Sequence, residues 1–358
     1  MKEVPAFSGG RETEGRMSSL RRSVVCSALV ALGTITPATT FAHQPGDFSQ
    51  FFRGVTIGDP LGAAPPPGLY FENVTMFAPS APGHGQVAAF KVNAPADIPI
   101  LLWSTGWNVL GASVLMAISQ PYYNVNAFSS TAGGPPFTGA THFPAVHNTW
   151  VNPLTLSWNL GNGWFASAGF SFYAPDGSRY NNSPNPDYWT FEPHAAISYL
   201  GGGWNLSANF FYNINASSAG HSGAFAGTPI AFFGQGYRSG DQAYLDVTAT
   251  KKFGKWEIGP VAYFKWQTTA DRPGGGFSCA AMAALTASQA TCGNATDIAV
   301  GALIGYDFGP VALKFYVTDS VYTRDDFGGV LVWTKLAFRV WGPDEAAPEK
   351  PGKPLIRK

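Results

Sequence analysis

Apolar and polar side chains alternate through long parts of this sequence, and that period limits what the chain can fold into. In segment 189–200 every second residue is mostly apolar or aromatic, and the residues between are mostly polar. The pattern recurs in 204–215, 242–250, 256–267 and 330–340. Side chains of a β-strand point alternately to the two faces of a sheet, so a period of two predicts strands. Runs of about 10–13 residues are longer than the strands of most soluble sheets.

The composition indicates that the apolar face looks outward into lipid. Charged residues make up 12% of the chain and aromatic residues 15%, while the mean hydropathy is zero. A soluble sandwich would bury the apolar faces inside, and the period alone does not distinguish the two arrangements. Tryptophans near strand ends, such as Trp164, Trp204 and Trp256, are typical of the aromatic girdles of membrane barrels.

One uncharged stretch, 98–119, also has to be weighed as a transmembrane helix. It opens a longer stretch, 98–175, that contains no Asp, Glu, Lys or Arg. Pro99, Gly106 and Gly111 interrupt the candidate helix, and one such helix would leave the alternation elsewhere unexplained. Strands are therefore expected here as well.

Turn signals divide the strands into an even set. Eleven connections join about twelve strands, and closure leaves no unpaired strand edge in lipid. The expected fold class is all-β, a closed antiparallel transmembrane β-barrel of about 12 strands with short periplasmic turns and long extracellular loops. Pro193 fits poorly, because it removes a ladder donor and so implies a bulge or a local register error. Tight turns are expected near 105–106, 161–163, 201–203, 253–255 and 308–310, and longer loops near 78–85, 129–149, 175–187, 217–238, 269–294 and 324–328.

The chain divides into four expected parts. Residues 1–42 have the features of a signal peptide, with Met17 as an alternative natural start, Arg21 and Arg22 before the apolar run 24–35, and a cleavage site ending at Ala42. The run is shorter than the roughly 20 residues of a spanning helix, which favours cleavage over a retained anchor. Residues 43–67 are expected as a periplasmic N-terminal segment or as a plug in the lumen. Residues 68–341 are the expected barrel, and 342–358 a flexible C-terminal tail.

The cysteines and histidines give no pattern for a metal or a cofactor. Cys26 lies in the apolar run and leaves with the signal, so Cys279 and Cys292 remain as a disulfide or as two free thiols. Of the six histidines, only His194 is expected on a strand, and no outward Ser lies near an outward His for lipid hydrolysis. We therefore expect no metal, no cofactor and no enzyme. With a net charge of zero and no basic block in the mature part, the chain also lacks an electrostatic basis for nucleic-acid binding.

The strand register places a balanced set of charges inside the barrel. Six acids face five bases, whereas a strongly ion-selective pore would carry one sign. We interpret the set as mutually paired charges that brace a narrow barrel, with contact to a solute as the alternative. The principal lumen-lining candidates are Glu192, His194, Asp246, Lys265, Lys314, Lys335 and Arg339, together with Glu72, Glu257, Asp297, Asp307 and Lys252.

Four short motifs, in order along the chain, resemble a known family. They are Pro66–Tyr70, Tyr188–Pro193, Tyr237–Gly240 with Asp246, and Gly259–Tyr263 with Gln267 and Asp271. Together they are similar to the outer-membrane protein family of the meta-pathway of phenol degradation, over roughly residues 64–341. The resemblance implies a barrel in the bacterial outer membrane that is associated with uptake of aromatic or other hydrophobic compounds.

The expected function is a porin-like channel for passive uptake of small, neutral hydrophobic or aromatic solutes. A structural or adhesive barrel without transport is the alternative, and an outer-membrane lipid hydrolase is a weaker one. The expected partners are outer-membrane lipids and lipopolysaccharide, the small solute, and the barrel assembly machinery.

Overall fold

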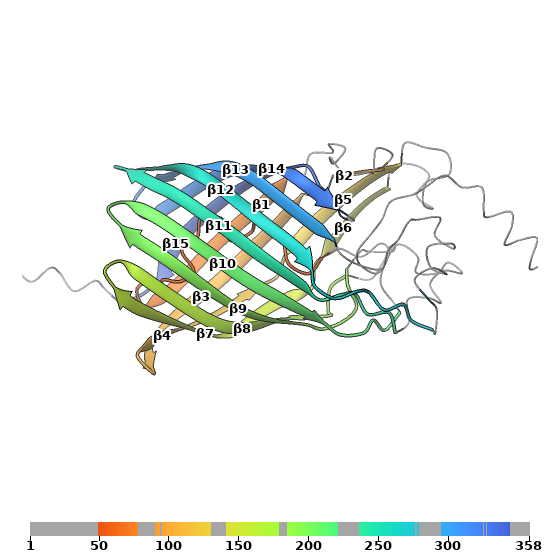
Figure 1. Ribbon diagram of the computed structural model, residues 1–358. Coiled ribbons are helices and arrows are strands. Elements are labelled where there is room, and N and C mark those ends of the chain that lie inside the picture. Colours follow the sequence, from red (N-terminus) through yellow and green to blue (C-terminus); the bar gives the residue numbers. More distant parts are fainter. Residues whose placement is uncertain are drawn as a thin grey trace, which may run out of the picture.

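Twelve strands form one closed antiparallel barrel in the computed structural model (Figure 1). β1 (Gly68–Phe77) closes the ring, because it pairs with β15 (Val330–Trp341) on one side and with β3 (Ala96–Val109) on the other. The predicted fold class is confirmed. The other wall strands are β4 (Ala112–Ser119), β7 (Thr149–Gly161), β8 (Trp164–Ala174), β9 (Thr190–Gly201), β10 (Trp204–Asn215), β11 (Gln242–Phe253), β12 (Trp256–Gln267), β13 (Thr296–Asp307) and β14 (Val311–Arg324).

The structure describes residues 49–77, 90–93, 95–129, 141–178, 185–220, 236–275, 278, 295–324, 326 and 328–343. The expected signal peptide, the two cysteines Cys279 and Cys292, and most of the expected tail lie outside these residues. Within them, no helix is long and apolar enough to cross a membrane.

Three short strands extend the sheet beyond one end of the barrel (Figure 1). β5 (Tyr122–Ser129) pairs with β2 (Phe90–Asn93) on one edge and with β6 (Thr141–Val146) on the other. The sequence predicts a single long loop over 129–149, and the structure instead places β6 inside that range. This end, which carries the longer connections, is called the loop end below.

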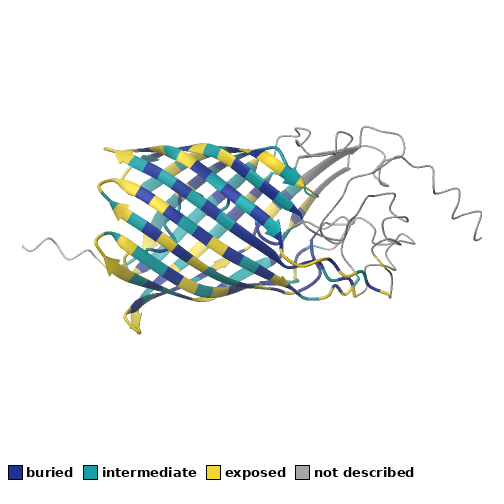
Figure 2. Ribbon diagram, viewed as in Figure 1, coloured by how far each residue is buried: buried dark blue, intermediate teal, exposed yellow. Residues whose placement is uncertain are grey.

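Burial alternates along the wall strands as the sequence predicts (Figure 2). On β9, Phe191 and Ile197 are exposed on the outer face, whereas Glu192 and Ser198 are fully buried. Such an outer face is stable only against hydrocarbon, because an antiparallel sheet in water buries its apolar side. The predicted sense of the two faces is confirmed.

The opposite end of the barrel carries tight hairpin turns and is called the turn end below. Leu110–Gly111, Asn162–Gly163 and Gly202–Gly203 each have positive φ at both positions, the geometry of two-residue turns whose twist matches that of the flanking strands. The turn predicted near 105–106 is wrong. β3 continues past Gly106, where the register with β4 shifts, and the chain reverses at Leu110–Gly111 instead. Gly106 marks a bulge, a second use of a positive-φ glycine that the sequence does not distinguish from a turn.

Pro193 sits in β9 without a bulge. Its partner on β8 is Phe170, in a continuous register. On the β10 side the pairing is interrupted between His194↔Phe211 and Phe191↔Ile214, yet the register is the same on both sides of the gap. The missing N–H of proline is therefore accommodated by a local loss of pairing, and the register predicted for β9 stands.

Candidate functional site

Residues 49–67 run through the inside of the barrel from the loop end to the turn end. Near the loop end, the side chain of Gln50 donates to the carbonyl of Tyr188 at 3.3 Å and accepts from Asn148 at 3.2 Å. Near the turn end, the amide of Ala64 donates to Ser157 Oγ at 3.0 Å. The chain then enters β1 at Gly68. The lumen is thus occupied by the polypeptide that precedes the first strand.

Polar side chains of β7 to β11 hold the backbone of this segment. Asp246 of β11, which is 1% exposed, accepts from the amides of Gly54 and Thr56 at 3.0 Å each and from Thr56 Oγ1 at 2.7 Å. Serine, threonine and asparagine side chains of these strands make further bonds, so the irregular backbone keeps its hydrogen bonds away from water. These bonds are Gly58 N to Thr248, Gly62 N to Ser198, Asn205 to the Gly58 carbonyl, Asn209 to the Thr56 and Asp59 carbonyls, Ser167 to the Leu61 carbonyl and Ser157 to the Gly62 carbonyl.

Strands on the opposite side of the lumen contribute an apolar and aromatic cluster. Ile57 is fully buried in a cluster with Tyr263, Leu303 and Trp333, to which β1, β3 and β12 to β15 contribute. A second aromatic cluster lies on the side of β10 and β11, where the ring of Phe51 lies 4.6 Å from that of Phe211 and 4.7 Å from that of Tyr244. The wall around the segment therefore combines polar side chains with two apolar and aromatic clusters.

Two of the predicted lumen lysines, Lys314 and Lys335, meet at one acid of the segment. Lys335 donates to the carboxylate of Asp59, which also lies 4.0 Å from Lys314 Nζ. Each lysine has a second acid on the wall: Glu72 lies 3.5 Å from Lys335, and Glu257 lies 3.7 Å from Lys314.

A second group of charges lies nearer the loop end. Arg53 of the segment pairs with Asp297 of β13 at 3.0 Å and with Asp326 at 3.1 Å. Lys265, predicted as a lumen residue, is buried and pairs with the same Asp326 at 2.7 Å. Sequence reasoning missed Asp59, Arg53 and Asp326 as the partners of the wall charges, since none of the three lies on a strand.

Glu192 and His194 lie together on the polar side. Glu192 accepts from Trp150 Nε1 at 2.9 Å, Ser171 Oγ at 2.7 Å and Asn213 Nδ2 at 2.8 Å. The ring of His194 lies 2.9 Å from Thr155 Oγ1 through Nε2. The Ser171 hydroxyl donates to the Glu192 carboxylate and also lies 3.3 Å from His194 Nδ1.

Arg339 takes a place apart from the other predicted lumen residues. Its guanidinium donates to the carbonyls of Pro67 at 2.7 Å and Pro343 at 3.0 Å, at the turn end, where the segment joins β1. Lys252 and Asp307, also predicted to face inward, are about half exposed near this end and lie 4.0 Å apart. These three residues do not contact the centre of the lumen.

Hydrogen bonds connect two of the longer connections at the loop end. Asp271 accepts from the amide of Gly240 at 2.6 Å, from Tyr237 Oη at 2.8 Å and from Gln267 Nε2 at 2.8 Å. Burial raises the pKa of Asp271 to about 6, against these three bonds, which favour the carboxylate. Burial likewise lowers the pKa of His147, which lies among aromatic rings between β6 and β7, to about 4. His147 is therefore neutral at neutral pH.

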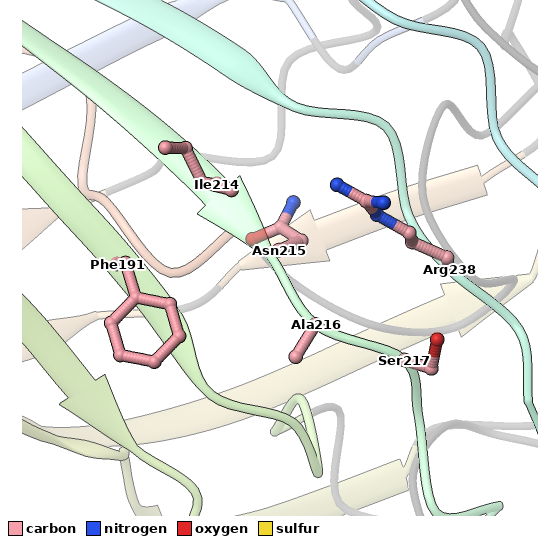
Figure 3. A pocket seen from close by; sticks show the side chains of 6 residues that line it. All are labelled: Phe191, Ile214, Asn215, Ala216, Ser217 and Arg238. Carbon is pink, nitrogen blue, oxygen red and sulfur yellow. The ribbon is translucent and has the colours of Figure 1, made fainter.

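A shallow pocket of about 260 Å³ lies on the outer face of the barrel at the loop end. Figure 3 shows Phe191 and Ile214 on neighbouring strands and Arg238 on the chain that leads into β11. Arg238 pairs with Asp241 at 3.3 Å. Since Phe191 and Ile214 face lipid, this pocket is separate from the lumen. The residues that line it are Phe191, Ile214, Asn215, Ala216, Ser217 and Arg238.

Among the described residues, no group of three or more His, Cys, Asp and Glu side chains is placed to hold a metal ion. The acids and bases of the lumen form ion pairs, and the carboxylate of Asp246 also accepts hydrogen bonds from backbone amides. This arrangement suits the holding of a polypeptide segment.

A sequence-family profile described as "Putative MetA-pathway of phenol degradation" matches residues 78–336. The resemblance seen in the four motifs is thereby confirmed. No curated protein matches the chain significantly.

Several solved structures are similar in fold. The COG4313 outer membrane channel from Pseudomonas putida F1 is 13% identical, with a TM-score of 0.60, covering 78% of this chain and 98% of that one. The CymD monoaromatic hydrocarbon channel is 7% identical with a TM-score of 0.34, covering 81% and 93%. Outer membrane phospholipase A from Escherichia coli is 12% identical with the same TM-score, covering 81% and 99%. The first likeness is one of fold, and the other two are too distant to bear on function.

The closed wall and its lipid-facing exterior locate the chain in the bacterial outer membrane. A barrel with an apolar outer band satisfies every backbone group within its own sheet, which is the condition for crossing a bilayer with strands. The predicted localisation is confirmed, and outer-membrane lipids are the surroundings of the wall.

Proposed function

Because this chain belongs to the family described as "Putative MetA-pathway of phenol degradation", we propose that it is a passive outer-membrane channel for small hydrophobic or aromatic solutes. The observation that carries the proposal is the mixed lining of the lumen. An apolar and aromatic cluster that includes Tyr263, Leu303 and Trp333 faces the hydroxyl and amide side chains of β7 to β11, which lie beside the carboxyl groups of Glu192 and Asp246. A small solute with an apolar body and one polar group matches such a lining.

We propose further that residues 49–67 are a plug that controls this path. In an eight-stranded barrel the side chains fill the interior, and a twelve-stranded barrel is wider. The lumen of this chain therefore has room for a solute only where the segment is absent. The segment is held by hydrogen bonds and ion pairs and not by continuous sheet pairing. Such contacts can be exchanged for water one at a time, which permits movement without unfolding of the wall.

Conductance of the purified protein in planar bilayers tests both proposals. Deletion of residues 43–60 is expected to raise the single-channel conductance and the flux of benzyl alcohol into liposomes, because it removes the chain between Asp246 and Lys335. Deletion of 344–358, a stretch of similar length after the last strand, serves as the matched control. Unchanged conductance after the first deletion would refute the plug. A protein that passes neither ions nor benzyl alcohol in any variant would instead support a structural or adhesive barrel.

We propose that the barrel has no catalytic activity. Ser171 and His194 are turned into the lumen, away from the lipid that a hydrolase of this kind attacks. A lipase assay on the folded protein in detergent is expected to give no turnover above that of a Ser171→Ala variant.

We propose lipopolysaccharide and the barrel assembly machinery as the other partners, as for an outer-membrane barrel in general.

In cells, the channel function predicts loss of growth on aromatic carbon sources after gene deletion, restored by the intact copy.

A further inference from the structure

The wall of β14 and β15 presents hydrogen-bond donors to the segment inside the lumen. Tyr316 Oη donates to the carbonyl of Gly54 at 2.8 Å, Lys314 Nζ donates to the carbonyl of Gly58, and Lys335 Nζ donates to the carboxylate of Asp59. Lys314, Tyr316, Trp333 and Lys335 are called the donor face below. The groups that accept these hydrogen bonds all belong to residues 54–59 of the chain itself.

One donor of this face has no acceptor in the described part of the chain. The Nε1–H of Trp333 is buried, and the whole side chain is 0% exposed. A buried donor without a partner is unfavourable, so an occupant of the lumen that offers an acceptor to this N–H would gain a hydrogen bond.

An apolar contact lies directly beside the donors. Ile57 is fully buried in the cluster that contains Tyr316 and Trp333, whose rings stack with their centroids 5.7 Å apart at 11°. Gly58 follows in a left-handed conformation, φ 87°, and a Cβ there would lie 2.8 Å from Leu303. The segment therefore presents an aliphatic side chain and, two residues later, a carboxylate to one patch of wall.

Lys314 and Lys335 together contact three carboxylates, and only two of these belong to the strands. Glu72 and Glu257 are the wall acids of Lys335 and Lys314, one for each lysine. Asp59 is the third acid, and its carboxylate makes the closest contact with Lys335. When the segment leaves, the position nearest to the Lys335 ammonium is vacated.

We propose that the donor face binds the carboxylate of a small aromatic or alicyclic acid, and that residues 57–59 occupy this site as an internal mimic. The inference rests on the proposed channel function and names the solute class of the same lumen. The ring of the acid takes the place of Ile57, and its carboxylate takes the place of Asp59 against Lys335 and Lys314. A neutral alcohol or phenol fills the apolar part but leaves the cationic position empty, so acids are preferred over neutral solutes of the same size.

The test uses full-length protein with Asp59 replaced by Ala, which removes the mimic carboxylate and leaves the wall intact. Binding of benzoate to the detergent-solubilised protein is measured by calorimetry, with benzyl alcohol and acetate as probes that lack the charge or the ring. We expect Asp59→Ala to bind benzoate at least tenfold more tightly than the natural chain. Asp307→Ala, which removes an acid at the turn end outside the donor face, is the matched control and is expected to bind as the natural chain does.

A second substitution tests whether Lys335 causes the gain in benzoate affinity. Lys335→Gln in the Asp59→Ala background is expected to abolish the gain for benzoate. Asp59→Asn, which keeps the size of the side chain, replaces Asp59→Ala if the alanine variant does not give the heat-modifiable gel mobility of a folded barrel.

The outcomes separate this inference from the channel function. Equal gains for benzoate and benzyl alcohol would refute the carboxylate site and leave the channel standing. Acetate binding as tight as benzoate binding would refute the apolar half of the site. Absence of flux for every solute, including through the variant that lacks residues 43–60, would refute the channel function itself.

Discussion

Replacement of Asp246 by Asn tests how residues 49–67 are held in the lumen. The carboxylate of Asp246 accepts three hydrogen bonds, two from backbone amides and one from the Thr56 hydroxyl. Asparagine offers one acceptor oxygen and turns an N–H donor toward groups that are themselves donors. A hydrogen bond to a charged acceptor contributes about 1.5–3 kcal/mol, so the loss of one such bond weakens the hold on the segment by about 2 kcal/mol. At about 1.4 kcal/mol for each factor of ten, the ratio of open to occluded channels rises roughly thirtyfold.

Single-channel recording in planar bilayers measures this ratio directly, as the fraction of time spent in the conducting state. Asp307→Asn makes the same chemical change at an acid that is about half exposed and does not contact the segment, and it is expected to leave the ratio unchanged. If Asp246→Asn and Asp307→Asn gave the same open fraction, the hydrogen bonds of Asp246 would not be what retains the segment.

Three further changes test other parts of the structure. Ile197→Arg on the lipid-facing side of β9 is expected to destabilise the barrel by about 2–4 kcal/mol in urea titrations in lipid vesicles. Leu110→Arg at the turn end should cost about 1 kcal/mol or less. Equal effects of the two substitutions would contradict the lipid-facing assignment. Lys265→Ala breaks the pair with Asp326 and is expected to lower the melting temperature and increase gating noise without changing ion preference, so a reversal of ion selectivity would contradict a bracing role. Asp271 has a folded-state pKa of about 6 against an ordinary value of 3.8, so its stabilising contribution is present below about pH 4 and is lost as the pH rises through 6. The melting temperature of Asp271→Asn should therefore change less between pH 4 and 6 than that of the natural chain, and parallel curves would contradict burial as the cause.

The wall of the barrel could be predicted from the sequence because its pattern is local. A period of two along β9 decides that Phe191 faces lipid and Glu192 faces inward, without knowledge of any distant residue. The same pattern placed Lys314 and Lys335 on the inner face. Where a local signal has two meanings, the prediction failed: Gly106 has the positive φ of a turn residue but forms a bulge, and the turn uses Leu110, a residue type that rarely adopts this conformation.

The contents of the lumen could not be predicted in the same way. Residues 49–67 have no periodicity, since their backbone bonds to the wall go to side chains of strands all around the barrel and not to a neighbouring strand. The choice between a periplasmic segment and a plug therefore stayed open at the sequence level. Asp59 and Arg53 are visible in the sequence as two charges in an uncharged surrounding, but only their positions in space show which wall residues they meet.

The route of residues 49–67 also sets how the chain is tethered. Gln50 lies at the loop end and Pro67 at the turn end, where the segment is continuous with β1. The covalent link to β1 fixes the segment at the turn end, so a displacement toward the loop end leaves Pro67 in place.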